Sequence, residues 1–157
     1  MGFIGGKTRS DARGAERRLG FKHAARSLGL PNDRIVLVGK PPVTMAQGSE
    51  GLESMLARWP DTDAIVCVSD LSAFGVLAEC QRRGIDVPGR IAIAGFGDFD
   101  VARYCHPRLT TIAFDCLEIG RSAGEAALAA LHARSKGKTR KPETIAVPFR
   151  LVARETA

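Results

Sequence analysis

The 157-residue chain contains no long hydrophobic run and few aromatic side chains, which make up 6% of its residues. A membrane-spanning helix needs about 18 or more consecutive apolar residues, and no stretch of that length is present. The start of the chain also lacks the positively charged segment followed by an apolar run that marks an export signal. These absences predict a cytoplasmic protein with no membrane partner.

Metal-binding and catalytic patterns are missing as well. The histidines and cysteines are scattered, without a Cys-Xaa-Xaa-Cys pair, so no metal site is predicted. Residues 2–6 are glycine-rich but do not follow Gly-Xaa-Gly-Xaa-Xaa-Gly, and no serine lies in Gly-Xaa-Ser-Xaa-Gly. We therefore expect no cofactor and no enzymatic activity. The thiols are expected to be buried in a reducing compartment: Cys67, Cys80, Cys105 and Cys116.

The net charge of +6 raises the question of nucleic-acid binding. Five of the basic residues fall within residues 134–141, a clustering that is typical of a solvated loop. No helix-turn-helix pattern is present. The sequence therefore favours a basic loop over a DNA-binding role for this chain.

Short β-rich apolar runs alternate with stretches whose apolar residues recur at helical spacing. Continuous apolar runs suit strands that are buried on both faces. The alternation predicts the α/β class, with a doubly wound parallel sheet covered by helices on both faces. The predicted strands are residues 1–5, 35–38, 64–68, 91–94, 110–114 and 144–152, the last with Pro148 at an edge or a bend. The predicted helix faces are Phe21, Ala24, Ala25 and Leu28; Leu52, Met55, Leu56 and Trp59; and Leu71, Phe74, Gly75 and Ala78.

A further helix is predicted over residues 117–133. Asp115 is its expected cap, with Glu118 three residues later as in a capping box. Small residues on its apolar face allow close approach to another helix or sheet, within one lobe or across an interface. These residues are Ile119, Ala123, Ala126, Ala127 and Ala130.

Ligands of open parallel sheets bind beyond the carboxyl ends of the strands, and the segment after the first predicted strand is rich in candidates there. Ser10 or Asp11 can cap a helix whose free amides favour an anion, and Arg13 and Arg17 follow about one turn apart. A carboxylate or a polyhydroxylated ligand suits this arrangement. Alternatively, Arg17 pairs with Glu16 or Asp11 as ordinary surface charge.

Three later strand ends supply further candidates. We expect Ser69 to face a ligand and Asp70 to be structural, since an Asp in this position is a good helix cap. Around Gly97, Asp98 and the two residues that follow, a carboxylate could accept hydrogen bonds from a sugar, although a plain turn explains the pattern almost as well. Phe114 is a candidate for stacking on the ligand.

The order of these features resembles the effector-binding core of the lac repressor family of transcription regulators. Asp11-Xaa-Arg13-Xaa-Xaa-Glu16-Arg17 opens the resemblance. It continues through Ser69-Asp70, Val87-Pro88-Gly89, Gly97-Asp98, Pro107-Xaa-Leu109-Thr110-Thr111 and Arg150-Leu151-Val152-Xaa-Arg154-Glu155.

The resemblance implies the carboxyl-terminal lobe of a two-lobed periplasmic-binding-protein-like (type I) module. Residues 1–113 would form this lobe, and residues 114–135 would be a crossing segment and a helix that packs on an amino-terminal lobe, leaving an apolar patch exposed here. Residues 136–157 would be a basic loop and a return strand. Operator DNA would be bound by a helix-turn-helix outside this chain.

The resemblance also implies roles for single residues. Arg17 matches the effector-binding arginine, Arg13 a neighbouring effector-facing position and Ser69 a ligand-contacting Asn or Ser. Where the family often has Gly-Phe-Asp-Asp, this chain has Gly97 in place of the first Asp. The lost acid and the added Arg13 make the site more positive, so a sugar acid such as gluconate is expected. The sequence from Gly95 to Ala102 is similar to that of the gluconate-repressor branch of the family, which agrees with the expectation of a sugar acid.

Family members dimerise through a helix that matches residues 71–83 and a loop that matches residues 99–105, so a homodimer is expected. The alternative is that these side chains are core. Closure of the two lobes on the effector would alter operator affinity. A solute-binding protein of a sugar transport system and a small flavodoxin-like protein are the competing classes. The interface candidates are Leu71, Phe99, Val101 and Tyr104.

Overall fold

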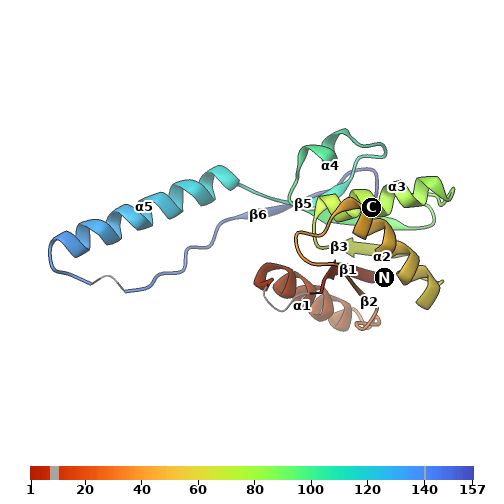
Figure 1. The fold of residues 1–157 in the computed structure, drawn as a ribbon, viewed down its shortest axis with the longest axis horizontal. Coiled ribbons are helices and arrows are strands. Elements are labelled where there is room, and N and C mark those ends of the chain that lie inside the picture. The colour runs from red at the N-terminus through yellow and green to blue at the C-terminus, as the bar shows by residue number, and fades with distance from the viewer. Residues whose placement is uncertain (8–10, 140) are drawn as a thin grey trace. The chain divides into compact units, whose positions relative to one another are not determined.

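The computed structural model describes residues 1–7, 11–139 and 141–157 (Figure 1). The chain divides into two compact units, one of residues 1–112 with 151–157 and the other of residues 113–150. The described elements, in chain order, are β1 (Gly2–Gly6), α1 (Ala12–Ser27), β2 (Ile35–Val38), α2 (Met45–Arg58), β3 (Ala64–Cys67), α3 (Asp70–Arg82), β4 (Ala92–Phe96), α4 (Asp100–Tyr104), β5 (Thr110–Phe114), α5 (Cys116–Ser135) and β6 (Phe149–Val152).

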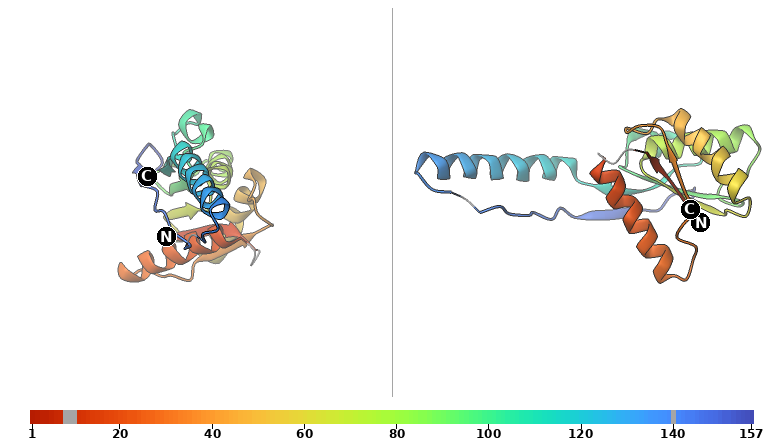
Figure 2. Two further views of the ribbon diagram at one scale, coloured as in Figure 1. Left: turned by 90° about the vertical axis from the view of Figure 1, so that its left-hand side faces the viewer. Right: turned by 60° about the horizontal axis from the view of Figure 1, so that its bottom comes forward.

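The strands form one six-stranded sheet in the order β2-β1-β3-β4-β5-β6. Strands β1 to β5 pair in parallel. Strand β1 lies between β2 and β3, with its Ile4 opposite Val36 of β2 and Cys67 of β3. Helix α1 lies on one face of the sheet and α2 and α3 on the other (Figures 1 and 2). The predicted α/β class with a doubly wound parallel sheet is confirmed. The chain order reverses between β1 and β3, which is where such sheets place their ligands.

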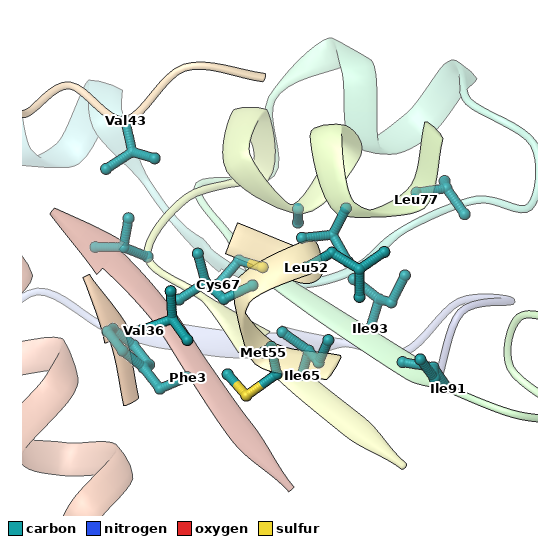
Figure 3. Packing of buried hydrophobic residues seen from close by; sticks show 14 of the residues in the cluster. Phe3, Val36, Val43, Leu52, Met55, Ile65, Cys67, Leu77, Ile91 and Ile93 are labelled. Carbon is teal, nitrogen blue, oxygen red and sulfur yellow. The ribbon is translucent and has the colours of Figure 1, made fainter. Parts of the chain in front are cut away.

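The core of the first unit lies between the sheet and its helices (Figure 3). Phe21 of α1 packs on Phe3 of β1 with ring centroids 5.6 Å apart. Helices α2 and α3 approach so closely that a Cβ on Gly48 would lie 2.1 Å from the Ser72 carbonyl oxygen. The fully buried residues of this core include Ile4, Leu52, Met55, Ile65, Leu77, Ile91 and Ile93.

The predicted apolar faces are only partly those that the structure buries. In α1, Phe21 and Ala25 are buried, but Leu28 is the C-cap and 70% exposed. In α3, Ala78 is exposed and Leu71 is only half-buried. Because α3 packs against both α2 and β4, its buried face is wide and turned away from the predicted one, and it comprises Asp70, Ser72, Ala73, Gly75, Val76, Leu77, Glu79 and Cys80.

Two predicted boundaries are wrong. The last strand begins at Phe149, after Pro148, because proline cannot donate a ladder hydrogen bond. It occupies the edge of the sheet, as predicted for a proline-bearing segment. Residues 100–104, predicted as loop, form the short helix α4, which starts after Phe99 without a side-chain cap.

In the second unit, α5 is capped as predicted, with the Asp115 carboxylate accepting a hydrogen bond from the Glu118 amide at 3.0 Å. No residue of this helix is buried. Its exposed apolar residues agree with the expected patch and include Leu117, Ile119, Leu128 and Leu131. Of the basic stretch that follows, Arg140 lies outside the described residues and the others are exposed.

Candidate ligand-binding site

Helix α1 begins at the carboxyl end of β1, where the sheet order reverses. Its cap is Asp11, whose carboxylate accepts a hydrogen bond from the Gly14 amide at 3.0 Å. The alternative cap, Ser10, lies outside the described residues. The helix therefore directs its amino-terminal end, with the positive partial charge of its free amides, toward the expected ligand position.

Arg17 joins three elements at this end of the sheet. Its Nη1 donates a hydrogen bond to the Val68 carbonyl oxygen at 2.8 Å, just after β3. The guanidinium carbon lies 3.7 Å from the centroid of the Phe96 ring at the end of β4. An arginine in this position is fixed by stacking and still carries further donors. The proposed surface pairing of Arg17 with Asp11 or Glu16 is absent from the ion pairs of the described residues.

Charges of both signs lie around Arg17. Burial lowers the pKa of Arg17, the charge of Arg13 lowers it further, and Asp11 and Asp70 oppose both effects. Arg13 is exposed one turn earlier on α1. An anion bound here would relieve the repulsion between the two arginines and replace part of the lost hydration of Arg17.

Ser69, rather than the predicted Asp70, caps α3. The Ser69 hydroxyl accepts a hydrogen bond from the Ser72 amide, and the two serine hydroxyls lie 3.1 Å apart. Its position directly after Val68 places Ser69 next to the residue that holds Arg17. Contact between Ser69 and a ligand stays a prediction.

Asp70 is structural in a different way from the one predicted. This fully buried carboxylate accepts hydrogen bonds from the Phe99 amide at 2.8 Å and from the Thr111 hydroxyl at 2.5 Å. Burial raises the pKa of Asp70, against the opposing effect of these two hydrogen bonds. A residue predicted from its place in the sequence as a cap instead ties the loop after β4 to α3 and β5.

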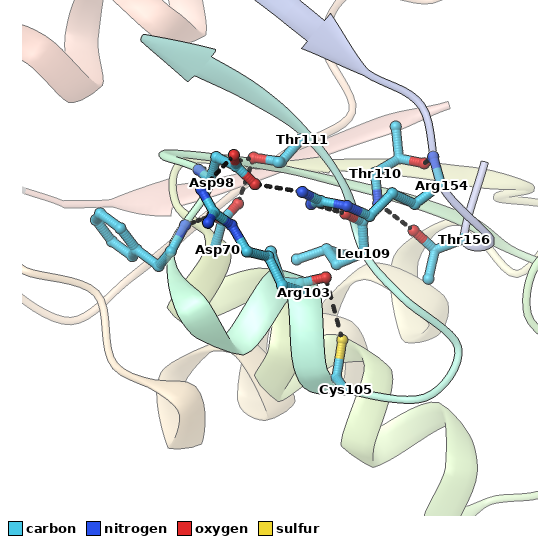
Figure 4. A network of polar contacts seen from close by, with 11 residues as sticks. Asp70, Asp98, Arg103, Cys105, Leu109, Thr110, Thr111, Arg154 and Thr156 are labelled. Atoms are coloured by element: carbon cyan, nitrogen blue, oxygen red, sulfur yellow. Dashed lines mark hydrogen bonds and ion pairs between the residues drawn. The ribbon is translucent and has the colours of Figure 1, made fainter. Parts of the chain in front are cut away.

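The Gly97-Asp98 turn follows the Phe96 ring that stacks on Arg17. Gly97 has a φ of 134° and Asp98 a φ of 53°, and both values are uncommon for residues with a side chain. Asp98 accepts hydrogen bonds from Arg103 at 2.9 Å and from Arg154 (Figure 4). Sequence reasoning missed these two arginines, and only the general rule that a buried acid needs a partner could have suggested them.

The remaining candidates are placed as follows. Phe114 is half-buried at the end of β5 and belongs to the second unit. Tyr104 is 84% exposed and Phe99 is 45% exposed, so the alternative that the interface candidates are core residues is wrong for Tyr104. Leu71 and Val101 are half-buried. The dimer interface stays a prediction.

Among the described residues, no group of three or more His, Cys, Asp or Glu side chains could hold a metal ion. Burial raises the pKa of the Cys67 and Cys80 thiols, to about 11 for Cys80, which favours the protonated thiol over the thiolate. The expectation of four buried thiols is correct for Cys67 and Cys80 but wrong for Cys105, which is half-buried, and for Cys116, which is exposed on α5. Within the described residues, no helix is long and apolar enough to cross a membrane.

A family model for the periplasmic binding protein-like domain matches residues 1–157. The chain belongs to this family. Among its curated relatives, the HTH-type transcriptional regulator GalR of Escherichia coli (strain K12) is 38% identical over 117 residues, which cover 73% of this chain and 34% of GalR. The HTH-type transcriptional regulator GntR of Pseudomonas aeruginosa is 32% identical over 156 residues, covering 99% of this chain and 44% of GntR.

The structure of a LacI family transcriptional regulator from Silicibacter pomeroyi is also similar, with a TM-score of 0.85 and 37% identity. The match covers 98% of this periplasmic binding protein-like chain and 54% of that one. The resemblance to the lac repressor family is thereby confirmed, and in these regulators the domain is the effector-binding portion. The chain spans less than half the length of both curated relatives.

Proposed function

We propose that this chain is the effector-sensing and dimerising portion of a cytoplasmic lac repressor family regulator, and that its effector is a sugar acid such as gluconate. Operator binding would belong to a helix-turn-helix in another part of the protein. The observation that carries this proposal is the Arg17 guanidinium, stacked on Phe96 and bonded to Val68 at the end of α1.

The chemistry of a sugar acid matches this site in two respects. Its carboxylate can accept a bidentate pair of hydrogen bonds from a guanidinium, which is the strongest geometry for this pair of groups. Its hydroxyls can bond to small polar groups such as the Ser69 side chain. Gly97 supplies no carboxylate to repel the ligand, and the acid beside it, Asp98, is already paired with arginines.

Two alternatives are weaker. A transport solute-binding protein would share the fold, but GalR and GntR, the two curated relatives described above, are transcriptional regulators. A neutral sugar would gain less from the two arginines, because a hydroxyl does not compensate their charge. We therefore retain the sugar acid as the effector and the regulator as the class.

A binding experiment tests the effector. We expect gluconate to raise the melting temperature of the full-length product of the gene, and glucose to do so much less. Arg17→Gln should weaken gluconate binding at least tenfold, since a charge-assisted pair contributes on the order of 1.5 kcal/mol or more. Arg26→Gln, in the last turn of the same helix, is the matched control and should leave binding unchanged.

The opposite result is equally informative. Tight binding of glucose with no response to gluconate in calorimetry would show that the positive charge at α1 does not select the effector. Equal losses of gluconate affinity for Arg17→Gln and Arg26→Gln would remove Arg17 from the binding site.

The expected homodimer has a test of its own. Tyr104→Asp should shift the protein toward monomer in sedimentation, whereas an unchanged dimer would place the interface elsewhere.

A further inference from the structure

The carboxyl-terminal residues are anchored in the sheet of the first unit. The fully buried Thr156 accepts a hydrogen bond from the Thr110 amide of β5 at 2.9 Å and donates one to the Ile93 carbonyl oxygen of β4 at 2.7 Å. The Ile93 amide in turn donates to the Thr156 carbonyl oxygen at 2.7 Å. Both strands therefore hold the end of the chain in one place.

Arg154 extends from this anchor to the loop after β4. Its backbone amide donates to the Thr110 hydroxyl and its Nη1 to the Leu109 carbonyl oxygen, both at 2.9 Å. Its Nη2 donates to Asp98 (Figure 4). The side chains of Arg154 and Asp98 are only 14% and 7% exposed. Because the bonds to Thr110 and Leu109 fix its position, this arginine can fix the position of the carboxylate in turn.

Asp98 lies in a left-handed conformation that residues with a side chain adopt rarely, although Asp and Asn adopt it more often than the others. Its φ of 53° is left-handed, a region that costs a residue with a side chain about 1 kcal/mol or more unless contacts enforce it. Arg154 holds one carboxylate oxygen and Arg103 the other. Burial raises the pKa of Asp98, but the hydrogen bonds from Arg154 and Arg103 together lower it below its usual value. At neutral pH the carboxylate is therefore ionised, and each of its oxygens accepts a hydrogen bond from an arginine.

The same loop borders the candidate site. The Phe96 ring stacks on Arg17, and Gly97 and Phe99, on either side of Asp98, are held by their amides. The Gly97 amide donates to the Ile112 carbonyl oxygen and the Phe99 amide to Asp70, both at 2.8 Å. A change in the Asp98 conformation would move the backbone beside the Arg17 stack.

We propose that Asp98 is a positioning residue rather than a ligand contact. Through Arg154, the carboxyl-terminal segment holds residues 97–99 in the conformation that the effector site requires. The effector in this statement is that of the proposed function, whereas the positioning of the loop can be measured without any ligand.

Hydrogen exchange on the protein without ligand tests the positioning. In Arg154→Gln, the amides of Gly97 and Phe99 should exchange at least about tenfold faster, while the β1 amides remain protected. Asp98→Asn should have a smaller effect in the same direction, because Asn tolerates a left-handed φ but has no charge. Glu155→Gln is the matched control, since Glu155 lies in the same segment and pairs with Arg108 at 2.8 Å.

Arg103→Gln is a second variant, for the case that Arg154→Gln does not fold. Arg103 is 53% exposed, so its replacement should not unfold the protein. We expect this variant to accelerate exchange in residues 97–99 by a smaller factor than Arg154→Gln. Unchanged exchange in both variants would overturn the proposal. Equal acceleration in Glu155→Gln would also overturn it, since the effect would then reflect general loosening of the end of the chain.

Gluconate titration of the full-length protein gives a second test. Where gluconate binds the parent protein, Arg154→Gln and Asp98→Asn should weaken it by roughly tenfold, or about 1.4 kcal/mol, and Glu155→Gln should not. Full affinity in a variant with a loosened loop would show that the effector does not need this conformation. If gluconate does not bind the parent protein, the sugar-acid proposal fails, and hydrogen exchange still decides whether Arg154 positions the loop.

Discussion

The two units of the chain use similar helices in opposite ways. Helices α2 and α3 of the first unit enclose buried residues such as Leu52 and Leu77, whereas the described residues of α5 in the second unit include none that is buried. Both units contain small residues at helical spacing, but only in the first do they mediate close packing. Apolar spacing therefore indicates a helix without indicating how much stability that helix obtains from its surroundings.

Truncation of a leucine in each unit should give the largest contrast. Leu52→Ala removes a fully buried side chain and should lower the free energy of unfolding by about 2–5 kcal/mol. Leu128→Ala removes a side chain that is 58% exposed on α5 and should change it by about 0.5 kcal/mol or less. Urea unfolding of the two variants measures both values. Equal losses would mean that α5 is covered in solution, for instance by a second copy of the chain.

Replacing a glycine by alanine in each unit should give a smaller contrast, in which one replacement destabilises the protein and the other stabilises it. At Gly48, an alanine Cβ would clash with the backbone of α3 and should cost about 1–3 kcal/mol. At Gly124 of α5 nothing lies within 4 Å, so alanine should stabilise the helix by up to about 1 kcal/mol through its better propensity. Thermal unfolding with circular dichroism compares the two. Destabilisation by Gly124→Ala would indicate a close partner for α5 in solution.

The smallest contrast concerns acidic pH. Arg82 and Arg83 hydrogen bonds lower the pKa of Glu79 from 4.5 to about 2, against a raising effect of burial. A folded-state pKa below the unfolded value stabilises the protein above pH 4.5, and this contribution is lost as the pH falls toward 2. Glu79→Gln should therefore be less stable than the parent at neutral pH, with the difference closing at acidic pH.

Glu118→Gln on α5 serves as the comparison for Glu79→Gln. Glu118 also has a lowered pKa because of Arg121, but this pair is exposed to solvent and is screened by salt. The pH-dependent difference in the free energy of unfolding between Glu118→Gln and the parent protein should be smaller than for Glu79→Gln, and it should vanish at high ionic strength. Urea unfolding at several pH values distinguishes the two, and a constant difference for Glu79→Gln across this range would contradict its assigned role.

Much of the fold could be predicted because it depends on local patterns. The alternation of apolar runs and helical spacing placed the strands near their observed positions, and Asp115 was identified as a cap because capping involves residues three apart. Among the site residues, Arg13 and Arg17 could be named because they follow a strand and begin a helix. The prediction that residues 100–104 form a loop failed because the segment is too short to show a helical pattern.

Partners distant in sequence could not be predicted. Asp70 looked like a cap, yet its carboxylate bonds to Thr111, which is 41 residues away. Asp98 looked like an acid available to a sugar, yet Arg154, 56 residues away, holds it. In each case the carboxylate is engaged by a group that only the folded sheet brings close. A buried charge needs such a partner, but the rule does not name one.

The α/β class, the order of the strands along the chain and the positive charge at the start of α1 can be read from the sequence, since they follow from periodicity and composition. The buried face of α3, the stacking of Arg17 on Phe96 and the contact between the end of the chain and Asp98 can be seen only in the folded protein. The physical reason is the separation in sequence between the residues that interact. Helical and strand periodicity is local, whereas burial and charge pairing depend on contacts between segments that the sheet brings together.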